Sequence, residues 1–426
     1  MALYINYGEG ADEATVQGAE WLQRIIADQK GADAEKEFNE KFSAFLVDGV
    51  LQDLGPVFDL FVDHSKDLFA SIPDARPEER VRDIEGFFAL VLSMLLLLDE
   101  EEHLDKATTR LCDLFSSSAD QQPELRLRLL MMLYNTFNDL PCEARYRVFK
   151  CVVDFSAKAR LFDQVLPYME YLDTWMVDWN AYLTIDDKRT LFRDIAQYMQ
   201  AFGKRLEHFL FLKRYHDSYQ GEKADAIGAK ETQDLAVELI KVAVALPSVI
   251  QFDDILNFDT VKALGKGKHK DLVELCRVFL SGTVSDLRDF NKKNPKLFDD
   301  HSLKFDDALA KVRLLSLASI VHGKSEISLS EVAEALQEDV DCVEKWVVRA
   351  ISEGVVDGRI DQFNSKVLVK TSFQRTFEKG EWSFLDSKLT QWIDNLENVI
   401  KFIGEQKVLR EGLAKEARGD KDPEEK

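Results

Sequence analysis

The sequence predicts an all-α protein in which pairs of helices stack into an irregular right-handed α-solenoid, with one small β-containing unit near the C-terminus. Three observations support this fold class. Apolar residues recur in steps of three and four along most of the 426 residues, and glycine (20) and proline (9) are scarce enough for long helices. One short segment, 352–370, instead alternates in steps of two and is rich in valine.

Length and composition bound the number of units and the class of partner. A chain of this length exceeds one compact domain, and 46% hydrophobic residues with 10% aromatics are enough for a large core. The 55 basic and 77 acidic residues give a net charge of −22. Nucleic acids and anionic membranes bind basic surfaces, so this charge favours protein partners, basic ones included.

Cysteine usage and the apolar segments predict a cytoplasmic protein. The five cysteines are odd in number and form no C-x-x-C pair, which favours free thiols over a disulfide frame or a zinc site. The first residues lack the basic and apolar regions of a signal peptide. The longest apolar run, Phe87–Leu98, is shorter than the ~17 residues that span a bilayer, so we expect a buried helix there.

The helical part runs from about residue 12 to about residue 320. Within it, one apolar stripe follows spacings of three and four and defines one helix face: Leu125, Leu129, Met132, Leu133, Thr136, Phe137 and Leu140. Three polar residues, Arg126, Arg128 and Asn135, fall off that face. The next helix opens near Pro141, a favoured first-turn residue, and gathers Tyr146, Phe149, Val152 and Val153.

The breaks between the helices are short. The polar stretches 116–122, 221–230 and 265–271 are brief enough to be loops within one continuous stack. No motif recurs at a fixed period, so we expect an irregular solenoid. Its apolar stripes are interpreted as core packing rather than as a site for chemistry.

Residues 303–377 have the element order of a winged-helix domain. The expected elements are helix 308–323, strand 326–328, helix 328–337, helix 341–354 and a hairpin of 355–361 against 366–370. Ser328 and Glu331 have the spacing of a capping box, and glycine ends two of the helices. An isolated hairpin is marginal in water, so the helices are expected to cover it.

Winged helices often bind DNA, but the charge of this one argues against that function. Residues 303–373 contain nine basic and twelve acidic residues, and the would-be recognition helix opens with four of the acidic ones: Glu338, Asp339, Asp341 and Glu344. We therefore expect the wing to be an interface between proteins, in which an edge strand pairs with another sheet. The candidate residues at this wing edge are Val355, Val356, Val367 and Val369.

A heptad pattern marks the C-terminal helix. Its seam has spacings of four and three, and consists of Leu385, Leu389, Trp392, Leu396, Val399 and Ile403. Ile393 and Ile400 widen this apolar strip. Part of the strip can fold back on the winged helix, or it can bundle with helices of other chains, and the pattern alone leaves both alternatives open. The charged end, 411–426, is expected to be disordered.

Motifs for catalysis, cofactors or metals are not found in the sequence. The seven histidines form no H-x-H or H-E-x-x-H pair, and no phosphate-binding glycine loop or G-x-S-x-G motif occurs. The acidic run 99–106 is interpreted as a solvated first helical turn. We expect no enzyme, no cofactor and no metal. A direct nucleic-acid binder stays as an alternative, with these lysines as its contacts: Lys266, Lys268, Lys270, Lys366 and Lys370.

Several segments carry a resemblance to a known family. They are RLRLLMMLYNTF (126–137), ARYRVFK (144–150), WMVDWN (175–180), AKVRLLSLASI (310–320) and VDCVEKWVVRAISEGVVDGRIDQ (340–362). In this order, with a solenoid, a winged helix and a terminal helix, they resemble the PCI family. Its members are scaffold subunits of the proteasome lid, the signalosome and eukaryotic translation initiation factor 3, and this chain is most similar to an initiation-factor subunit.

The resemblance implies domains and partners. The expected domains are an N-terminal helical repeat region (1–205), a PCI domain (206–377, with helical repeats at 206–302 and the winged helix at 303–377), a C-terminal bundling helix (378–410) and a disordered acidic tail (411–426). It implies a non-catalytic scaffold whose partners are other initiation-factor subunits and, through the complex, the small ribosomal subunit, in support of mRNA and initiator tRNA recruitment. Direct DNA or membrane binding is not implied, and any RNA contact is indirect or weak. A scaffold of the signalosome or proteasome lid is the alternative.

Overall fold

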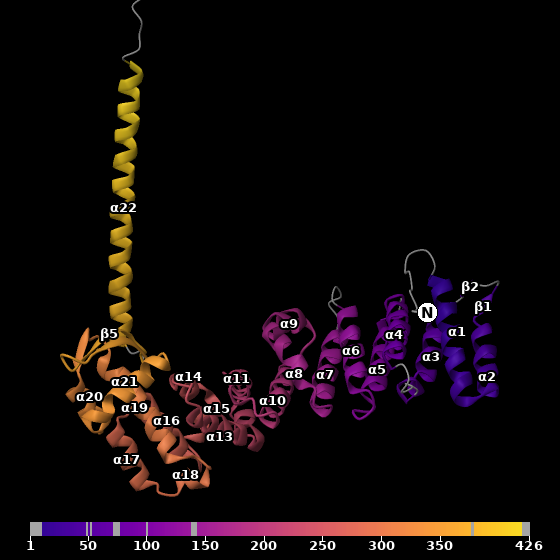
Figure 1. The fold of residues 1–426 in the computed structure, drawn as a ribbon, viewed down its shortest axis with the longest axis horizontal. Helices are drawn as coiled ribbons and strands as arrows, with labels where there is room; N and C mark the ends of the chain where they lie inside the picture. The colour runs from indigo at the N-terminus through magenta and orange to yellow at the C-terminus, as the bar shows by residue number, and fades with distance from the viewer. Residues whose placement is uncertain are drawn as a thin grey trace, which may run out of the picture. The chain divides into compact units, whose positions relative to one another are not determined.

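The computed structural model describes residues 11–47, 50–51, 53–70, 77–98, 101–137, 143–375 and 379–419 (Figure 1). The chain divides into two units, Met1–Phe211 and Leu212–Lys426, and each is described here by itself. The expected domain boundaries at residues 205, 302 and 377 stay predictions.

The regular elements among the described residues of unit 1 are helices, apart from one pair of two-residue strands. Its long helices are α1 (Ala11–Lys30), α2 (Ala32–Ser43), α3 (Leu54–His64), α4 (Pro77–Leu96), α5 (Glu101–Ser116), α6 (Pro123–Thr136), α7 (Glu143–Lys158) and α10 (Ile185–Ala201). Shorter elements are β1 (Leu46–Val47), β2 (Val50–Leu51), η1 (Lys66–Ala70), α8 (Phe162–Val165), η2 (Leu166–Tyr171), α9 (Leu172–Asp178) and η3 (Trp179–Ala181). Helix α11 (Arg205–Asp217) spans the boundary between the units.

Helices of unit 1 pack on neighbours that are close in sequence, as a solenoid requires. Helix α1 contacts α3 and α4, α4 contacts α6, and α5 contacts α7. The predicted buried helix at Phe87–Leu98 is confirmed for Phe87–Leu95 in the second half of α4, whereas α4 ends at Leu96, and Leu96 and Leu97 are 47% and 53% exposed. There the rings of Phe87 and Phe88 are fully buried and meet Phe61, Phe69 and Phe115 from three other elements.

Helix α6 departs from the prediction at one residue. Leu125, Leu129 and Leu133 are buried as expected, but Arg126, which was placed off the buried face, is only 2% exposed. Its guanidinium donates hydrogen bonds to the carbonyls of Leu114 (2.8 Å) and Phe115 (3.1 Å) at the end of α5. The buried face of α6 is therefore wider than its apolar stripe, because a helix in a solenoid contacts a neighbour on each side. Leu140 and Pro141 lie outside the described residues.

Unit 2 begins with a helical layer, continues with the winged helix and ends with one long helix. The layer consists of α12 (Ala224–Ile227), α13 (Lys230–Ala245), α14 (Asp253–Asn257), α15 (Asp259–Leu264), α16 (Lys270–Ser281), α17 (Val284–Lys293) and α18 (Leu297–Asp300). The polar stretches 221–230 and 265–271 join these helices, although the first includes the short helix α12. Helix α19 (Phe305–Val321) packs on both α13 and α17 and so connects the layer to the winged helix.

The winged helix follows the predicted element order. It contains α19, β3 (Glu326–Ser328), α20 (Leu329–Leu336), α21 (Val340–Ser352), β4 (Val356–Asp361) and β5 (Lys366–Ser372). The Ser328 hydroxyl accepts a hydrogen bond from the amide of Glu331 and caps α20, which is one half of the predicted capping box. The Glu331 carboxylate pairs with Lys324 at 3.6 Å. The short strand and the hairpin form one antiparallel sheet in the order β3-β5-β4, so β5 is its centre.

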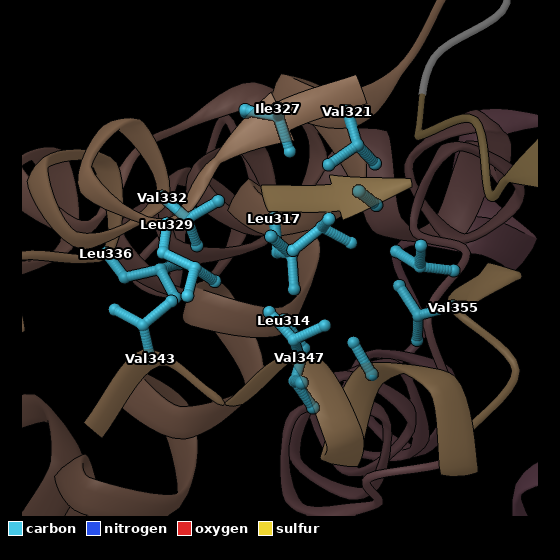
Figure 2. Close-up of a cluster of buried hydrophobic side chains, with 14 of the residues drawn as sticks. Leu314, Leu317, Val321, Ile327, Leu329, Val332, Leu336, Val343, Val347 and Val355 are labelled. Carbon is cyan, nitrogen blue, oxygen red and sulfur yellow. The ribbon is translucent and has the colours of Figure 1, made fainter. Parts of the chain in front are cut away.

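The sheet and three helices enclose one apolar cluster (Figure 2). Leu314 and Leu317 come from α19, Val343 and Val347 come from α21, and Val355 precedes β4. Alternate residues of a strand face opposite sides of a sheet, so Val367 and Val369 of β5 can both face this cluster, while Leu368 between them is 42% exposed. The cluster supplies the helical cover that the hairpin requires.

Helix α22 (Lys379–Gly419) is the last described element (Figure 1). It continues past residue 410, where the sequence analysis expected the helix to end and a disordered tail to begin. Leucine, alanine, lysine, glutamate and arginine in the stretch 411–418 are strong helix formers, and Gly419 is a common stop, so apolar content was the wrong criterion there. Residues 420–426 lie outside the described residues.

Candidate protein interface

Helix α22 exposes the whole predicted heptad seam. The exposed fractions of its six residues range from 39% for Leu385 to 64% for Trp392, and Leu389, Leu396, Val399 and Ile403 lie between these values. Ile393 and Ile400 are exposed as well. Single exposed apolar residues are common on protein surfaces, whereas contiguous strips of large ones are rare. A strip of this kind indicates a binding surface.

The seam has the geometry of a coiled-coil strand. At 3.6 residues per turn, its six residues stay within about 40° of one line along the helix. Ile393 and Ile400 lie beside this line and broaden the strip on one side. The opposite side carries polar residues such as Asp394, Glu397 and Lys401. We name the six seam residues together with Ile393 and Ile400 the α22 strip.

The wing valines do not occupy the exposed position that the sequence analysis gave them. Val355, Val356 and Val367 are buried at 2% exposure or less in the winged-helix core, and Val369 packs against that core on the central strand β5. Their β-branched side chains are therefore core residues of this chain. The prediction chose them for their alternation, but alternation also selects the face that the chain itself buries.

The exposed feature of the wing is the backbone of β4, which forms an edge of the sheet. Among the described strands, β4 pairs only with β5, and its other side has no strand partner. Gly358 lies at an irregularity in this pairing, between Asp357 and Gly358, which locally twists the strand. An edge strand with unpaired amide and carbonyl groups can add a strand from another protein.

Acidic and paired side chains line the surface where a winged helix would contact DNA. Asp339 and Asp341 are exposed at the start of α21, and Glu344 accepts a hydrogen bond from Gln362 (3.3 Å). Two of the candidate nucleic-acid lysines are held in ion pairs: Lys366 with Glu326 (2.8 Å) and Lys370 with Asp357 (3.2 Å). Lys270 of the basic loop pairs with Glu274 (3.4 Å), whereas Lys266 and Lys268 are exposed.

Arg375, which the sequence analysis did not single out, ties the chain after β5 to the helical layer. Its buried guanidinium donates to the carbonyls of Phe279 (2.7 Å) and Gly282 (3.0 Å) at the end of α16. Burial lowers the pKa of Arg375 to about 10, so the group stays charged at neutral pH. A cation at a helix C-terminus also meets the negative end of the helix dipole. This contact holds the chain after β5, up to Arg375, against the helical layer.

Lys311 of α19 makes a similar contact with α13. Its buried amine donates to the carbonyls of Ala243 (2.5 Å) and Leu246 (2.8 Å), and it lies 4.7 Å from the centre of the Phe252 ring. Burial lowers the pKa of Lys311 to about 7. A neutral amine has two N–H groups, and the two carbonyls accept both of them.

Lys311→Met is expected to change the pH dependence of stability. Between pH ~7 and ~10 the unfolded chain holds a proton that the folded chain has released, so the wild-type protein gains stability as pH rises, by up to about 1.4 kcal/mol per pH unit. The variant lacks this titration. Urea unfolding of both proteins across this pH range should give curves that diverge, and parallel curves would contradict the assignment.

Clusters of metal ligands and membrane-spanning helices are not found in the described part of the chain. No three histidine, cysteine or acidic residues there are grouped as a metal site. None of the helices described is both long and apolar enough to cross a membrane. Cys112, Cys151, Cys276 and Cys342 are free thiols, while Cys142 lies outside the described residues.

Comparison with known families gives a match in the winged-helix region. The family model described as "PCI domain" matches residues 287–371. This range holds most of α17, all of α18 to α21, and nearly all of the three-stranded sheet. The match therefore covers the part of unit 2 that contains the apolar cluster and the β4 edge.

Curated relatives extend the similarity along most of the chain. A protein named eukaryotic translation initiation factor 3 subunit M from Dictyostelium discoideum is 29% identical over 77% of this chain and 80% of its own length. Proteins of the same name from Nematostella vectensis (28%; 74% of this chain and 81% of its own) and Aspergillus terreus (29%; 81% and 75%) are also similar. Residues 287–371 thus match the PCI domain, and the chain is similar, over most of its length, to proteins named subunit M of eukaryotic translation initiation factor 3.

Proposed function

We propose that this chain is a non-catalytic structural subunit of eukaryotic translation initiation factor 3. The observation that carries the proposal is the α22 strip, an exposed apolar surface on a helix that follows a PCI domain. The names of the relatives support the choice of complex. The role consists of binding other subunits rather than of converting a substrate.

Assembly through α22 follows from the energetics of apolar burial. Each large side chain of the strip stabilises a helical bundle by ~1.5–3 kcal/mol when it leaves water. Part of that energy is spent on ordering the partners, so the strip accounts for binding only if several of its residues are buried together. Heptad spacing allows this, because it keeps one face of α22 against a neighbouring helix over the whole seam.

The winged helix provides a second contact in this proposal. The free edge of β4 pairs with a sheet edge of a neighbouring subunit, and hydrogen bonds between backbones supply the contact. The valines named in the sequence analysis support that edge from inside, since they fix the sheet on its helices. Their replacement would therefore damage the fold before it affected a partner.

The wider setting of the proposal is the cytoplasm, where initiation factor 3 acts on the small ribosomal subunit. The chain supports assembly of the complex and thereby the recruitment of mRNA and initiator tRNA. Direct contact of the winged helix with nucleic acid is not part of the proposal, since its wing lysines are ion-paired and its α21 start is acidic.

Affinity purification of the tagged full chain from eukaryotic cells tests the choice of complex. We expect other subunits of initiation factor 3 as the main partners, with proteins of the small ribosomal subunit at lower yield. Recovery of proteasome-lid or signalosome components in their place would assign the chain to a sister complex. Recovery of the chain alone would overturn the scaffold role.

A further inference from the structure

A second surface, in unit 1, combines exposed aromatic rings with acidic side chains. Tyr168 and Tyr171 of η2 are 44% and 56% exposed. They stand three residues apart, and side chains at this spacing align along a 3-10 helix. The ring of Tyr171 contacts the ring of the half-buried Trp175, with 6.2 Å between the ring centres. These rings form one column on the surface of η2 and α9.

The column packs against aromatic residues of neighbouring helices. Trp175 meets the rings of Tyr134 (5.3 Å) and Phe149 (5.4 Å), which lie on α6 and α7. The ring of the buried Trp179 also packs on Phe149, with 5.2 Å between the ring centres. A surface built on packed rings needs little ordering when a partner binds, which is a property of binding hot spots.

The chain segment that carries the column is acidic. Residues 162–187 contain six acidic residues and no lysine, arginine or histidine. Of these, Glu170, Asp173 and Asp178 are exposed beside the rings on η2 and α9. Burial raises the pKa of Tyr134 to about 12, while the Arg145 guanidinium opposes this rise and Asp178 adds to it.

The chain itself already places a guanidinium on these rings. Arg145 of α7 lies with its guanidinium carbon 5.0 Å from the centre of the Tyr134 ring. Arginine stacks on aromatic faces and pairs with carboxylates at the same time, which lysine does less well. A surface of tyrosine, tryptophan and carboxylates therefore has the chemistry to hold further arginines.

We propose that Tyr168, Tyr171 and Trp175, with Glu170, Asp173 and Asp178, form a docking surface for an arginine-rich segment of a partner protein. The arginines stack on the rings and pair with the carboxylates, and aliphatic residues between them cover the exposed apolar atoms. This acidic aromatic surface lies in unit 1, outside the PCI domain and α22, so it extends beyond the proposed function.

Binding of a fluorescent synthetic peptide with alternating arginine and leucine tests the surface on the full-length protein. We expect Tyr168→Ser with Tyr171→Ser to weaken binding at least about tenfold, as loss of a hot-spot pair does. Glu170→Gln with Asp173→Asn and Asp178→Asn should weaken it as well, and the difference should shrink in high salt. A glutamine-for-arginine peptide should bind poorly.

A matched control is available on α11. Leu206 and Leu210 are 45% and 46% exposed, and their neighbours Lys204 and Arg205 are basic. Leu206→Ser with Leu210→Ser should leave peptide affinity within about twofold of wild type, because the segment 204–210 carries a single carboxylate, Glu207, and two basic residues that disfavour an arginine-rich peptide. Circular dichroism should show all variants folded, since the changed side chains are exposed.

Three results would overturn the proposal. An equal loss of peptide affinity in the tyrosine and the leucine variants would mean that the peptide binds an acidic protein without a defined site. Equal affinity for the glutamine peptide would remove the role of charge. If charge substitutions in the α22 strip weaken peptide binding and the tyrosine variant does not, the peptide binds α22 instead.

Discussion

Replacing Leu389, Trp392 and Leu396 with glutamate is expected to abolish co-assembly of the chain with its partner subunits. These three residues lie at the middle of the α22 strip and are exposed in the isolated chain. Burial of each contributes ~1.5–3 kcal/mol to a bundle, and a carboxylate in the same place must be desolvated at further cost. The sum is several kcal/mol, which lowers affinity by orders of magnitude.

Co-purification of the tagged variant with initiation-factor subunits measures this effect. Circular dichroism should show unchanged helix content, because the replaced side chains contribute little to the fold of their own chain. A charge-swapped control on the polar side of α22, with Asp394→Lys, Glu397→Lys and Lys401→Glu, should assemble normally. An intact complex in the strip variant would mean that another surface carries assembly.

Replacing Arg126 with methionine is expected to destabilise unit 1 by about 3 kcal/mol. The buried guanidinium donates to the carbonyls of Leu114 (2.8 Å), Phe115 (3.1 Å) and Gln121 (2.8 Å), and lies 3.8 Å from the centre of the Phe69 ring. Methionine fills similar space but donates no hydrogen bond. The carbonyls at the end of α5 then lack their partners, and buried acceptors without donors are costly.

Hydrogen exchange followed by mass spectrometry localises this loss. Amides of α5 and α6 should exchange faster in the variant, while those of the winged helix should be unchanged. Arg128→Met is the matched control, two residues along the same helix, where the side chain is half-exposed and pairs with Glu85 at 2.9 Å. A surface pair is worth ~0–1 kcal/mol, so the control should exchange nearly as wild type. Equal effects of both substitutions would contradict the capping role of Arg126.

Local patterns predicted the elements whose stability is local. The capping residue Ser328, the order of helix and strand in the winged helix, and the buried run in α4 are all confirmed. Each depends on neighbours within one or two turns, or on an apolar segment that water excludes wherever it packs. The heptad seam of α22 is equally visible in the sequence, and the structure shows it exposed.

Residues whose partners come from distant elements were not predictable in this way. Arg126, Lys311 and Arg375 read as ordinary surface cations, yet each is buried against the carbonyls at the end of another helix. The wing valines were assigned to an outer edge because alternation does not say which face of a sheet is covered. The acidic aromatic surface was not predicted, because the sequence does not show which of its rings are exposed.

The sequence by itself determined the class of this protein: periodic apolar faces make helices, one alternating segment makes a wing, and a net charge of −22 disfavours unaided nucleic-acid binding. Only the tertiary structure decided which side of each element meets the chain itself and which meets solvent. The physical reason is that periodicity encodes the existence of a buried face, whereas the identity of its neighbour depends on contacts between residues far apart in the chain.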